Sequence, residues 1–333
     1  MGNNKVSKNN AFIGALRANL GILSVLVLLI VLLSFLSPVF LKYDNIISVL
    51  RQVSINMYLA LGMTLIIITG GIDLSVGAIV AMCGTLTVGF IVTNGLPIWL
   101  AIVIGLALGT LCGFLSGLTI ATLKLPAFIV TMSMMNIAKG IGYVYSGGRS
   151  TRLVDDAFNA LGTGYLSFIP LPVLYMLILL VVFSVILNKT KFGTYIYAIG
   201  GNRESARLSG VPIKKVEIAV YTISGALSAF AGLVLCSRMY SGQPSVGDGY
   251  ELDAIAACVL GGVSMSGGVG RISGTVIGVL VIGIISNGLN LMNVSSYWQL
   301  ILKGLIILCA VIIDMFRNCL LYTSPSPRDP KTS

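Results

Sequence analysis

The residue types that could do chemistry are concentrated in four short segments, and the most polar of these lies within residues 188–217. Inside it, residues 202–210 predict a short helix. Asn202 is a good N-cap, Glu204 lies in the first turn, and Gly210 suits the left-handed conformation that ends many helices. A short, basic surface of this kind could bind a partner protein in the cytoplasm, so this helix is a candidate docking element.

The positive charge of the predicted helix lies on one side. Arg203 and Arg207 are four residues apart, so their side chains project from the same face. An isolated helix of this length is only marginally stable in water. The alternative interpretation is therefore a solvated loop with the positive charge typical of the cytoplasmic side of a membrane protein. The candidate docking residues are Asn202, Arg203, Glu204, Ala206, Arg207, Ser209 and Gly210.

The second segment, residues 70–77, reads GGIDLSVG and contains a carboxylate between apolar runs. A carboxylate at the centre of a bilayer costs roughly 2.5–3.5 kcal/mol on insertion scales, so Asp73 must lie at an interface or accept hydrogen bonds. We expect it to cap the following helix through the free N–H groups of residues 74–77; contact with an ion or a substrate is the alternative. The candidate motif residues here are Gly70, Gly71, Asp73, Ser75 and Gly77.

The third segment places Glu251 and Asp253 in the first turn of a predicted helix, where carboxylates suit its positive end. Glycosidases also use two carboxylates, but residues two apart on a helix point to different faces, so catalysis is not expected. The run GGVSMSG that begins at Gly261 weakly echoes residues 70–77, as in the internal repeats of transporters.

The fourth feature is a pair of cations, Lys139 and Lys303, inside apolar surroundings. Both lie near the ends of apolar runs, so we expect their ammonium groups to reach the lipid headgroups. The alternatives are pairing with an acidic residue inside the protein, or lining of a pathway.

Other chemistries are excluded by composition. The chain has no histidine and no G-x-x-x-x-G-K-[ST] loop, so it lacks the usual general base and a nucleotide-binding P-loop. Its six cysteines form no C-x-x-C pair and are interpreted as packing residues. With 56% hydrophobic and only 10% charged residues, against about 25% charged in a soluble domain, the chain is an integral membrane protein and not a soluble enzyme. Its net charge of +10 is distributed as membrane topology requires, so no nucleic-acid partner is expected.

The elements that must position these residues are apolar helices. A helix needs roughly 20 apolar residues to cross about 30 Å of hydrocarbon, and about ten runs of this kind predict an all-α membrane protein. The eighth is short and flanked by glycine. The runs are residues 20–41, 47–69, 74–92, 98–123, 128–145, 171–187, 218–236, 251–262, 275–291 and 298–316.

The chain divides into three parts. Residues 1–19 are expected to be a cytoplasmic segment ahead of a retained signal-anchor, and residues 20–317 are expected to form the transmembrane domain. Residues 318–333 are Pro- and Ser-rich and resemble the translation of a sequencing-library adapter, so they are expected to be a non-native tail.

Lysine and arginine set the orientation, because they are enriched in cytoplasmic loops. With an even number of crossings, both termini are predicted to be cytoplasmic. The cytoplasmic set would be Lys5, Lys8, Arg17, Lys124, Lys189, Lys191, Arg203, Arg207, Lys214, Lys215, Arg271 and Arg317. The smaller outer set would be Lys42, Arg51, Arg149, Arg152 and Arg238.

Small residues recur within the fourth run. Gly105, Gly109, Gly113 and Gly117 are spaced every four residues, which lets two helix backbones approach closely in lipid. We expect tight packing within one subunit; a subunit interface or a pathway lining is the alternative.

Four segments also carry a family resemblance. The chain reads GGIDLSVG from Gly70, YIYAIGGNRESARLSG from Tyr195 and GYELDAIAACVLGG from Gly249, and it closes with NGLNL from Asn287 and VSSYWQ from Val294. These segments resemble the ribose-type permeases of bacterial ABC importers, and the resemblance covers nearly all of residues 34–314.

The resemblance implies a multi-pass, non-enzymatic permease of the bacterial cytoplasmic membrane that acts as a homodimer. It implies a cytoplasmic ABC ATPase that uses ATP and Mg²⁺, and a periplasmic or lipid-anchored sugar-binding protein. In that family a cytoplasmic helix docks in a groove of the ATPase, and residues 202–210 match it. This chain itself is expected to bind no cofactor and no metal.

Ribose is the expected sugar, while galactoside, xylose and autoinducer-2 permeases share much of the pattern. Hydroxyl and amide side chains could line a sugar pathway. Those available are Ser75, Thr131, Asn136, Asn287, Asn290 and Gln299, and Asn287 and Gln299 complete the motif candidates with Glu251 and Asp253.

Two other classes of function compete. An ion-coupled secondary sugar transporter would use Asp73 with Lys139 or Lys303 as a coupling pair and would need no ATPase. A membrane scaffold without transport would account for the basic loop but not for the many glycines beside the apolar runs.

Overall fold

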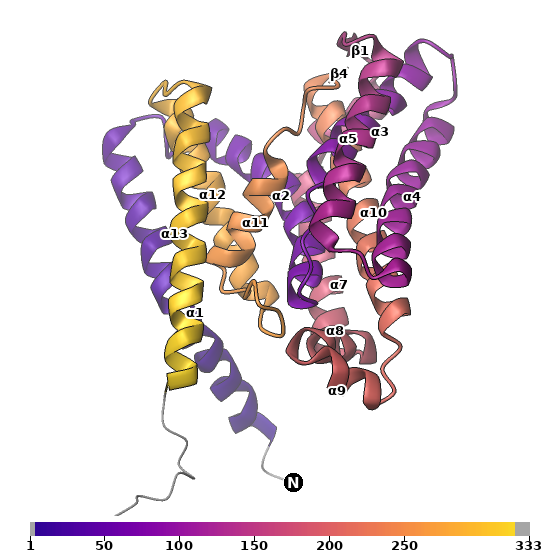
Figure 1. Cartoon of the computed structure of the whole chain (residues 1–333). Helices are drawn as coiled ribbons and strands as arrows, with labels where there is room; N and C mark the ends of the chain where they lie inside the picture. Colours follow the sequence, from indigo (N-terminus) through magenta and orange to yellow (C-terminus); the bar gives the residue numbers. More distant parts are fainter. Residues whose placement is uncertain (1–3, 324–333) are drawn as a thin grey trace, which may run out of the picture.

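The computed structural model describes residues 4–323, which form a bundle of helices with two very short sheets (Figure 1). The helices are α1 (Asn4–Leu36), α2 (Tyr43–Ile68), α3 (Val76–Val92), α4 (Ile98–Leu123), α5 (Ala127–Ser146), α6 (Asp156–Thr163), α7 (Leu171–Lys189), α8 (Lys191–Gly201), α9 (Arg203–Leu208), α10 (Ile213–Met239), α11 (Tyr250–Leu260), α12 (Ile272–Leu291) and α13 (Ser296–Thr323). The strands are β1 (Thr151–Arg152), β2 (Tyr165–Leu166), β3 (Ile169–Pro170) and β4 (Ser241–Gly242). Both sheets are antiparallel pairs, β1 with β4 and β2 with β3.

The predicted all-α membrane class is confirmed. Each of the ten predicted apolar runs overlaps one helix of the structure, and the fourth coincides with α4 at both ends. Among the described residues, 6 helices are long and apolar enough to cross a membrane, namely α2, α4, α5, α7, α10 and α12. Shorter apolar helices are Leu20–Leu36 within α1, α3, and Ser296–Cys309 within α13.

Helix α2 forms the centre of the bundle. Its residues from Val53 to Ile68 are buried on every side, which suits a helix that is apolar all round. Helices α1, α11, α12 and α13 lie on one side of it, and α3, α4, α5 and α10 lie on the other (Figure 1).

The evenly spaced glycines of α4 pack against α10. A Cβ at Gly113 would overlap the carbonyl oxygen of Tyr221, and one at Gly117 would lie 2.9 Å from the Cα of Ile218. The predicted close approach of two helices therefore occurs within this chain. Gly105 differs, because its neighbour is the Thr87 side chain of α3.

The eighth apolar run forms the shortest helix of the set. With 11 residues, α11 is about 16 Å long, half of what a membrane crossing requires. The preceding residues 243–249 are not helical. Together they carry the chain from β4 to the opposite end of the molecule, where α8 and α9 lie (Figure 1).

The boundaries predicted between the three parts of the chain fall within continuous helices. Residues 4–19 continue the same helix as the first apolar run, and α13 continues into the predicted non-native tail as far as Thr323. Residues 1–3 and 324–333 lie outside the described part of the chain, so these two domain boundaries stay predictions.

Candidate functional site

The predicted docking helix is present as α9, and its ends are those expected from the sequence. The Asn202 side chain accepts a hydrogen bond from the backbone N–H of Ser205 at 2.8 Å, which caps the helix. At the other end, Ser209 is the C-cap and Gly210 adopts a left-handed φ of 79°. The side chain of Ala206 is buried, so α9 is seated on the rest of the protein.

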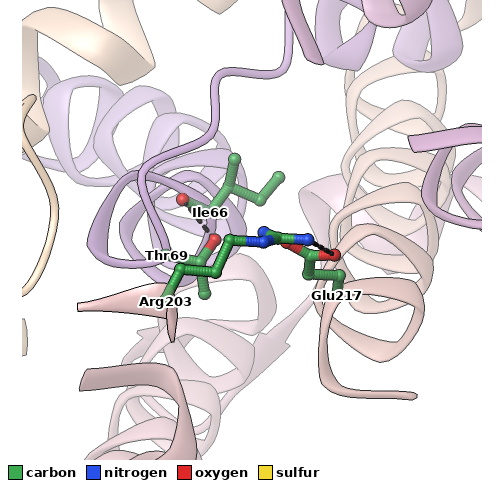
Figure 2. A network of polar contacts seen from close by, with 4 residues as sticks. All are labelled: Ile66, Thr69, Arg203 and Glu217. Atoms are coloured by element: carbon green, nitrogen blue, oxygen red, sulfur yellow. Dashed lines mark hydrogen bonds and ion pairs between the residues drawn. The ribbon is translucent and has the colours of Figure 1, made fainter. Parts of the chain in front are cut away.

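Arg203 is 48% exposed, and its guanidinium reaches back to α10. Its guanidinium makes a two-pronged ion pair with Glu217 of α10; one contact joins Nη1 to Oε1 and the other joins Nη2 to Oε2 at 3.0 Å (Figure 2). Glu217 is only 5% exposed. A buried carboxylate needs a partner, and the fork of an arginine fits it at two points. The hydrogen bond that the Arg203 guanidinium donates to this carboxylate raises the pKa of Arg203.

The outward surface of α9 is mixed rather than purely basic. Arg207 pairs with Glu204 at 2.9 Å, and both side chains are mostly exposed. Leu208 beside them is 80% exposed. Exposed leucine and charge together suit a protein contact. The sequence analysis missed Leu208, because nothing local distinguishes an exposed leucine from a buried one, and it missed Glu217, because its partner is not adjacent in the chain.

A cavity of about 700 Å³ lies behind α9. It is bounded by the start of α10 and by the turn between α4 and α5, and its cationic lining residues outnumber its acidic ones. Because both acidic residues of the lining, Glu204 and Glu217, are already paired with arginines, the remaining charge is that of Lys124, Lys214 and Lys215.

Glycines join the helix before α9 to the centre of the bundle. The N–H of Gly268 donates to the carbonyl of Ile68 at 2.8 Å, and a Cβ at Gly200 would overlap that same carbonyl. A Cβ at Gly267 would lie 3.2 Å from the nitrogen of Gly70. The two glycine-rich segments that echo each other in the sequence thus meet here, at the end of α8. We call Gly70, Gly200, Gly267 and Gly268 the glycine junction.

Asp73 is buried and fully occupied by hydrogen bonds. Its Oδ1 accepts from the backbone N–H of Ser75 at 2.9 Å and from the Ser75 hydroxyl at 2.6 Å, and its Oδ2 accepts from the Ser224 hydroxyl of α10 at 3.0 Å. Asp73 thus fixes the turn at Ser75, the N-cap residue just before α3, without a hydrogen bond to the N–H groups of the helix itself, and it ties this turn to α10. Gly71 leaves room for the Tyr221 hydroxyl, and Gly77 for the carbonyl of Gly247.

The two carboxylates of α11 point to different neighbours, as predicted. Glu251 lies against Gly77 of α3. Asp253 accepts from the ammonium of Lys303 of α13 at 2.8 Å, and both side chains are largely buried. Lys139 of α5 pairs with Asp248 at 2.7 Å. The expectation that both lysines reach the headgroups is therefore wrong, since each has a carboxylate within the bundle, and neither pairs with Asp73.

The remaining motif residues connect helices near α12. Asn287 and Asn45 of α2 exchange side-chain hydrogen bonds of 2.9 and 3.2 Å. Gln299 donates to the Asn290 side chain at 2.8 Å and to the carbonyl of Val294 at 3.0 Å, which fixes the turn between α12 and α13. These amides connect neighbouring helices and turns. Within the described part of the chain, the predicted motif residues lie at several separate places and do not form one cluster.

Comparison with known proteins identifies the family. Residues 45–311 match the model of the branched-chain amino acid transport system permease component. The chain belongs to this permease family. The match begins at the start of α2 and ends within α13, so it includes α9, the glycine junction and Asp73.

Individual members of the permease family are close relatives. The Ribose import permease protein RbsC of Haemophilus influenzae is 46% identical over 295 residues, which cover 87% of this chain and 91% of the relative. The protein of the same name from Bacillus subtilis is 48% identical over 291 residues, covering 87% and 90%. The L-arabinose transport system permease protein AraH of Escherichia coli is 39% identical over 311 residues, covering 93% and 94%. No solved structure matches this chain.

Membership and fold together establish a multi-pass permease subunit of the bacterial inner membrane. A permease of an ABC importer works with an ATPase and a binding protein.

Proposed function

We propose that this chain is the membrane-spanning subunit of an ATP-driven importer for a monosaccharide, and that the sugar is ribose. The observation that carries the proposal is the identity of 46% and 48% to ribose import permeases over 87% of the chain. L-arabinose is the second candidate, because an arabinose permease is 39% identical over 93% of the chain.

The topology we propose has ten crossings with both termini in the cytoplasm. Nine helices and the combined segment 243–260 account for the crossings. The basic residues around α8 and α9 support a cytoplasmic position for that end of the bundle, and β1 and β4 would then face outward.

We place the ATPase at α9. The surface offered to it consists of Glu204, Arg207 and Leu208, while Arg203 connects α9 to α10 through Glu217. ATP binding by the partner would favour one packing of the two permease subunits in a homodimer, and its release would favour the other. The partner would supply ATP, Mg²⁺ and all of the chemistry, and this subunit would catalyse nothing. A sugar-binding protein would deliver the substrate at the opposite face.

The decisive experiment is uptake of radiolabelled ribose into proteoliposomes that contain the permease, its ATPase and its binding protein, with and without ATP. We expect uptake only when all three proteins and ATP are present. Uptake of L-arabinose in place of ribose would keep the mechanism and change the sugar. Uptake by the permease alone under a proton or sodium gradient would contradict the proposal and favour the ion-coupled alternative.

A further inference from the structure

One ion pair of the bundle lies in a position that a structural role does not explain. The Nζ of Lys139 and the Oδ1 of Asp248 are 2.7 Å apart, and the two side chains are 35% and 57% exposed. The pair between Lys303 and Asp253, by contrast, is 23% and 6% exposed. The Lys139–Asp248 pair is therefore open to whatever fills the space beside α5 and α11.

The pair lies well inside the membrane region. Helix α5 has 20 residues and is about 30 Å long, so Lys139 lies about 10 Å from its outer end at Ser146. Asp248 follows Gly247, which packs on Gly77 in the first turn of α3, about 22 Å along that helix from Val92. Measured along these helices, Lys139 is about 10 Å and Asp248 about 22 Å below the outer end, so both lie below the outer surface of the bundle.

Charged groups that are exposed at this depth face a partner or water, because exposure to hydrocarbon is costly. Lysine can avoid that cost by extending its ammonium toward the headgroups. Here the ammonium is turned to Asp248 instead, and the Asp248 carboxylate is the more exposed of the two. Both observations favour a polar space between α5 and the segment that leads into α11.

Other exposed residues of α5 show where polar and apolar side chains lie around this helix. Asn136, Lys139 and Tyr143 follow one another at spacings of three and four residues, so they lie on one face. Ile137 and Val144 lie about 100° around the helix and belong to an exposed, apolar stripe that suits lipid. The polar residues therefore lie on one side of the exposed surface of α5, where Ile129 and Met132 are exposed as well, and Ile137 and Val144 lie on the adjacent side.

We propose that Lys139 and Asp248, with Asn136 and Tyr143, form a contact site for the sugar on the translocation pathway. A sugar hydroxyl both donates and accepts hydrogen bonds, so an ammonium and a carboxylate 2.7 Å apart can bind neighbouring hydroxyls at once. An amide and a phenol beside them add further donors and acceptors. The site suits a neutral molecule with several hydroxyl groups. This inference rests on the proposed function and identifies residues that the transported sugar would contact.

Accessibility to water tests the location of the site. Single cysteines would replace Asn136, Lys139, Tyr143 or Asp248 in a background with Cys309→Ser and Cys319→Ser, since Cys83, Cys112, Cys236 and Cys258 are buried. Ile137→Cys and Val144→Cys are matched controls on the apolar face of the same helix. We expect a charged, membrane-impermeant thiosulfonate to modify the four polar-face cysteines at least tenfold faster than the two controls, and ribose with the binding protein and ATP to slow the reaction.

Two results would overturn the proposal. Equal rates on both faces, or no modification at any of the four polar positions, would show that this face is not on an aqueous pathway. Asn136→Cys and Tyr143→Cys leave the ion pair intact, so they give an answer even where Lys139→Cys fails to insert.

Transport separates a substrate contact from a structural pair. We expect Asp248→Asn and Lys139→Met to reduce sugar uptake about tenfold while ATP hydrolysis by the assembled complex is unchanged. Aminoethyl thiosulfonate, which restores an ammonium at Lys139→Cys, should recover part of the uptake, whereas the uncharged methyl reagent should not. Full uptake in both neutral variants would contradict a substrate contact. Absence of uptake in the unaltered complex would instead count against the proposed function. The cysteine labelling would still test whether this face of α5 is exposed to water.

Discussion

At the scale of single residues, the two arginines of α9 have different tasks despite their shared spacing. Arg203 neutralises a buried carboxylate, and Arg207 belongs to an exposed pair with Glu204. Breaking an ion pair whose acid is buried costs far more than breaking one in water, because the remaining charge has no compensation. The two positions therefore separate stability from partner binding.

We predict that Arg203→Ala destabilises the permease by about 3 kcal/mol, while Arg207→Ala changes stability by less than about 0.5 kcal/mol. Unfolding of the purified protein in detergent, followed by heat or denaturant, measures both. Glu217→Gln with Arg203→Met should recover much of the loss. Equal stability of the two single variants would contradict a structural role for the pair between Arg203 and the buried Glu217.

The two arginines of α9 also predict how substitutions would interrupt the coupling of ATP hydrolysis to uptake. Arg207→Glu with Leu208→Asp should abolish ATP-driven uptake while the permease remains inserted and thermally stable, because only the exposed surface of α9 changes. Arg203→Glu with Arg207→Glu should also stop uptake, but with loss of stability. Co-purification of the ATPase with each variant distinguishes the two causes. Normal uptake by the first variant would remove α9 as the docking site.

Asp73 provides another residue-scale test. Asp73→Ala removes the acceptor for Ser75 and Ser224, and we expect a loss of about 1–2 kcal/mol in the free energy of unfolding. Asp73→Asn retains an acceptor oxygen and should lose less. ATP-dependent uptake per folded molecule should persist in Asp73→Asn, since the role is structural. A proton-coupled transporter that used Asp73 would lose all transport in this variant.

At the scale of elements, the glycine junction connects the docking end of the molecule to its core. Helix α8, which leads directly into α9, is in backbone contact with the end of α2 and with the loop between α11 and α12. Backbones can approach this closely only where no Cβ intervenes. Helix α9 is therefore connected to the rest of the bundle both through α8 and through the Arg203–Glu217 pair to α10.

Adjacent glycines give a controlled test of the junction. A Cβ at Gly200 would overlap the carbonyl of Ile68, whereas a Cβ at Gly201 has nothing within 4 Å. We predict that Gly200→Ala costs more than about 3 kcal/mol and abolishes uptake, and that Gly201→Ala is tolerated. The amount of folded protein in membranes and its uptake rate are the readouts. A functional Gly200→Ala variant would mean that α8 is not packed on α2.

The positions of the helices could be predicted from the sequence better than the contacts between them. The ends of α4 and the caps of α9 follow from local signals, such as Pro97, Asn202 and Gly210, that act within a few residues. The partner of Lys139 lies more than a hundred positions away in the chain, so spacing within one sequence does not identify it. For the same reason the sequence did not predict that Arg203 pairs with Glu217, because the buried Glu217 belongs to another helix.

At the scale of the whole molecule, the chain separates two chemically different ends around an apolar core. One end gathers α8, α9 and the lysines at the start of α10, and the other carries β1, β4 and α6 (Figure 1). Such a division fits a subunit that receives energy at one face and substrate at the other.

Labelling of the two ends tests the proposed orientation. Ser150 and Lys214 are both exposed and lie beside opposite ends. In intact spheroplasts, an impermeant maleimide should label Ser150→Cys, and should label Lys214→Cys only after the membrane is opened. The reverse pattern would invert the topology and place α9 away from any cytoplasmic ATPase.

The half-length helix α11 also has a consequence for how the protein is made. The non-helical residues 243–249 and an 11-residue helix cannot enter lipid unaided, because their backbone polar groups and the carboxylate of Asp253 would be without partners there. Those partners come from α2, α3 and α13, whose Lys303 is translated 50 residues after Asp253. The segment must therefore wait, beside the translocon or within a water-filled gap of the nascent bundle, until α13 arrives. Placement of α11 thus depends on a helix that is made after it, and a chain that stops before residue 303 would leave Asp253 without its partner.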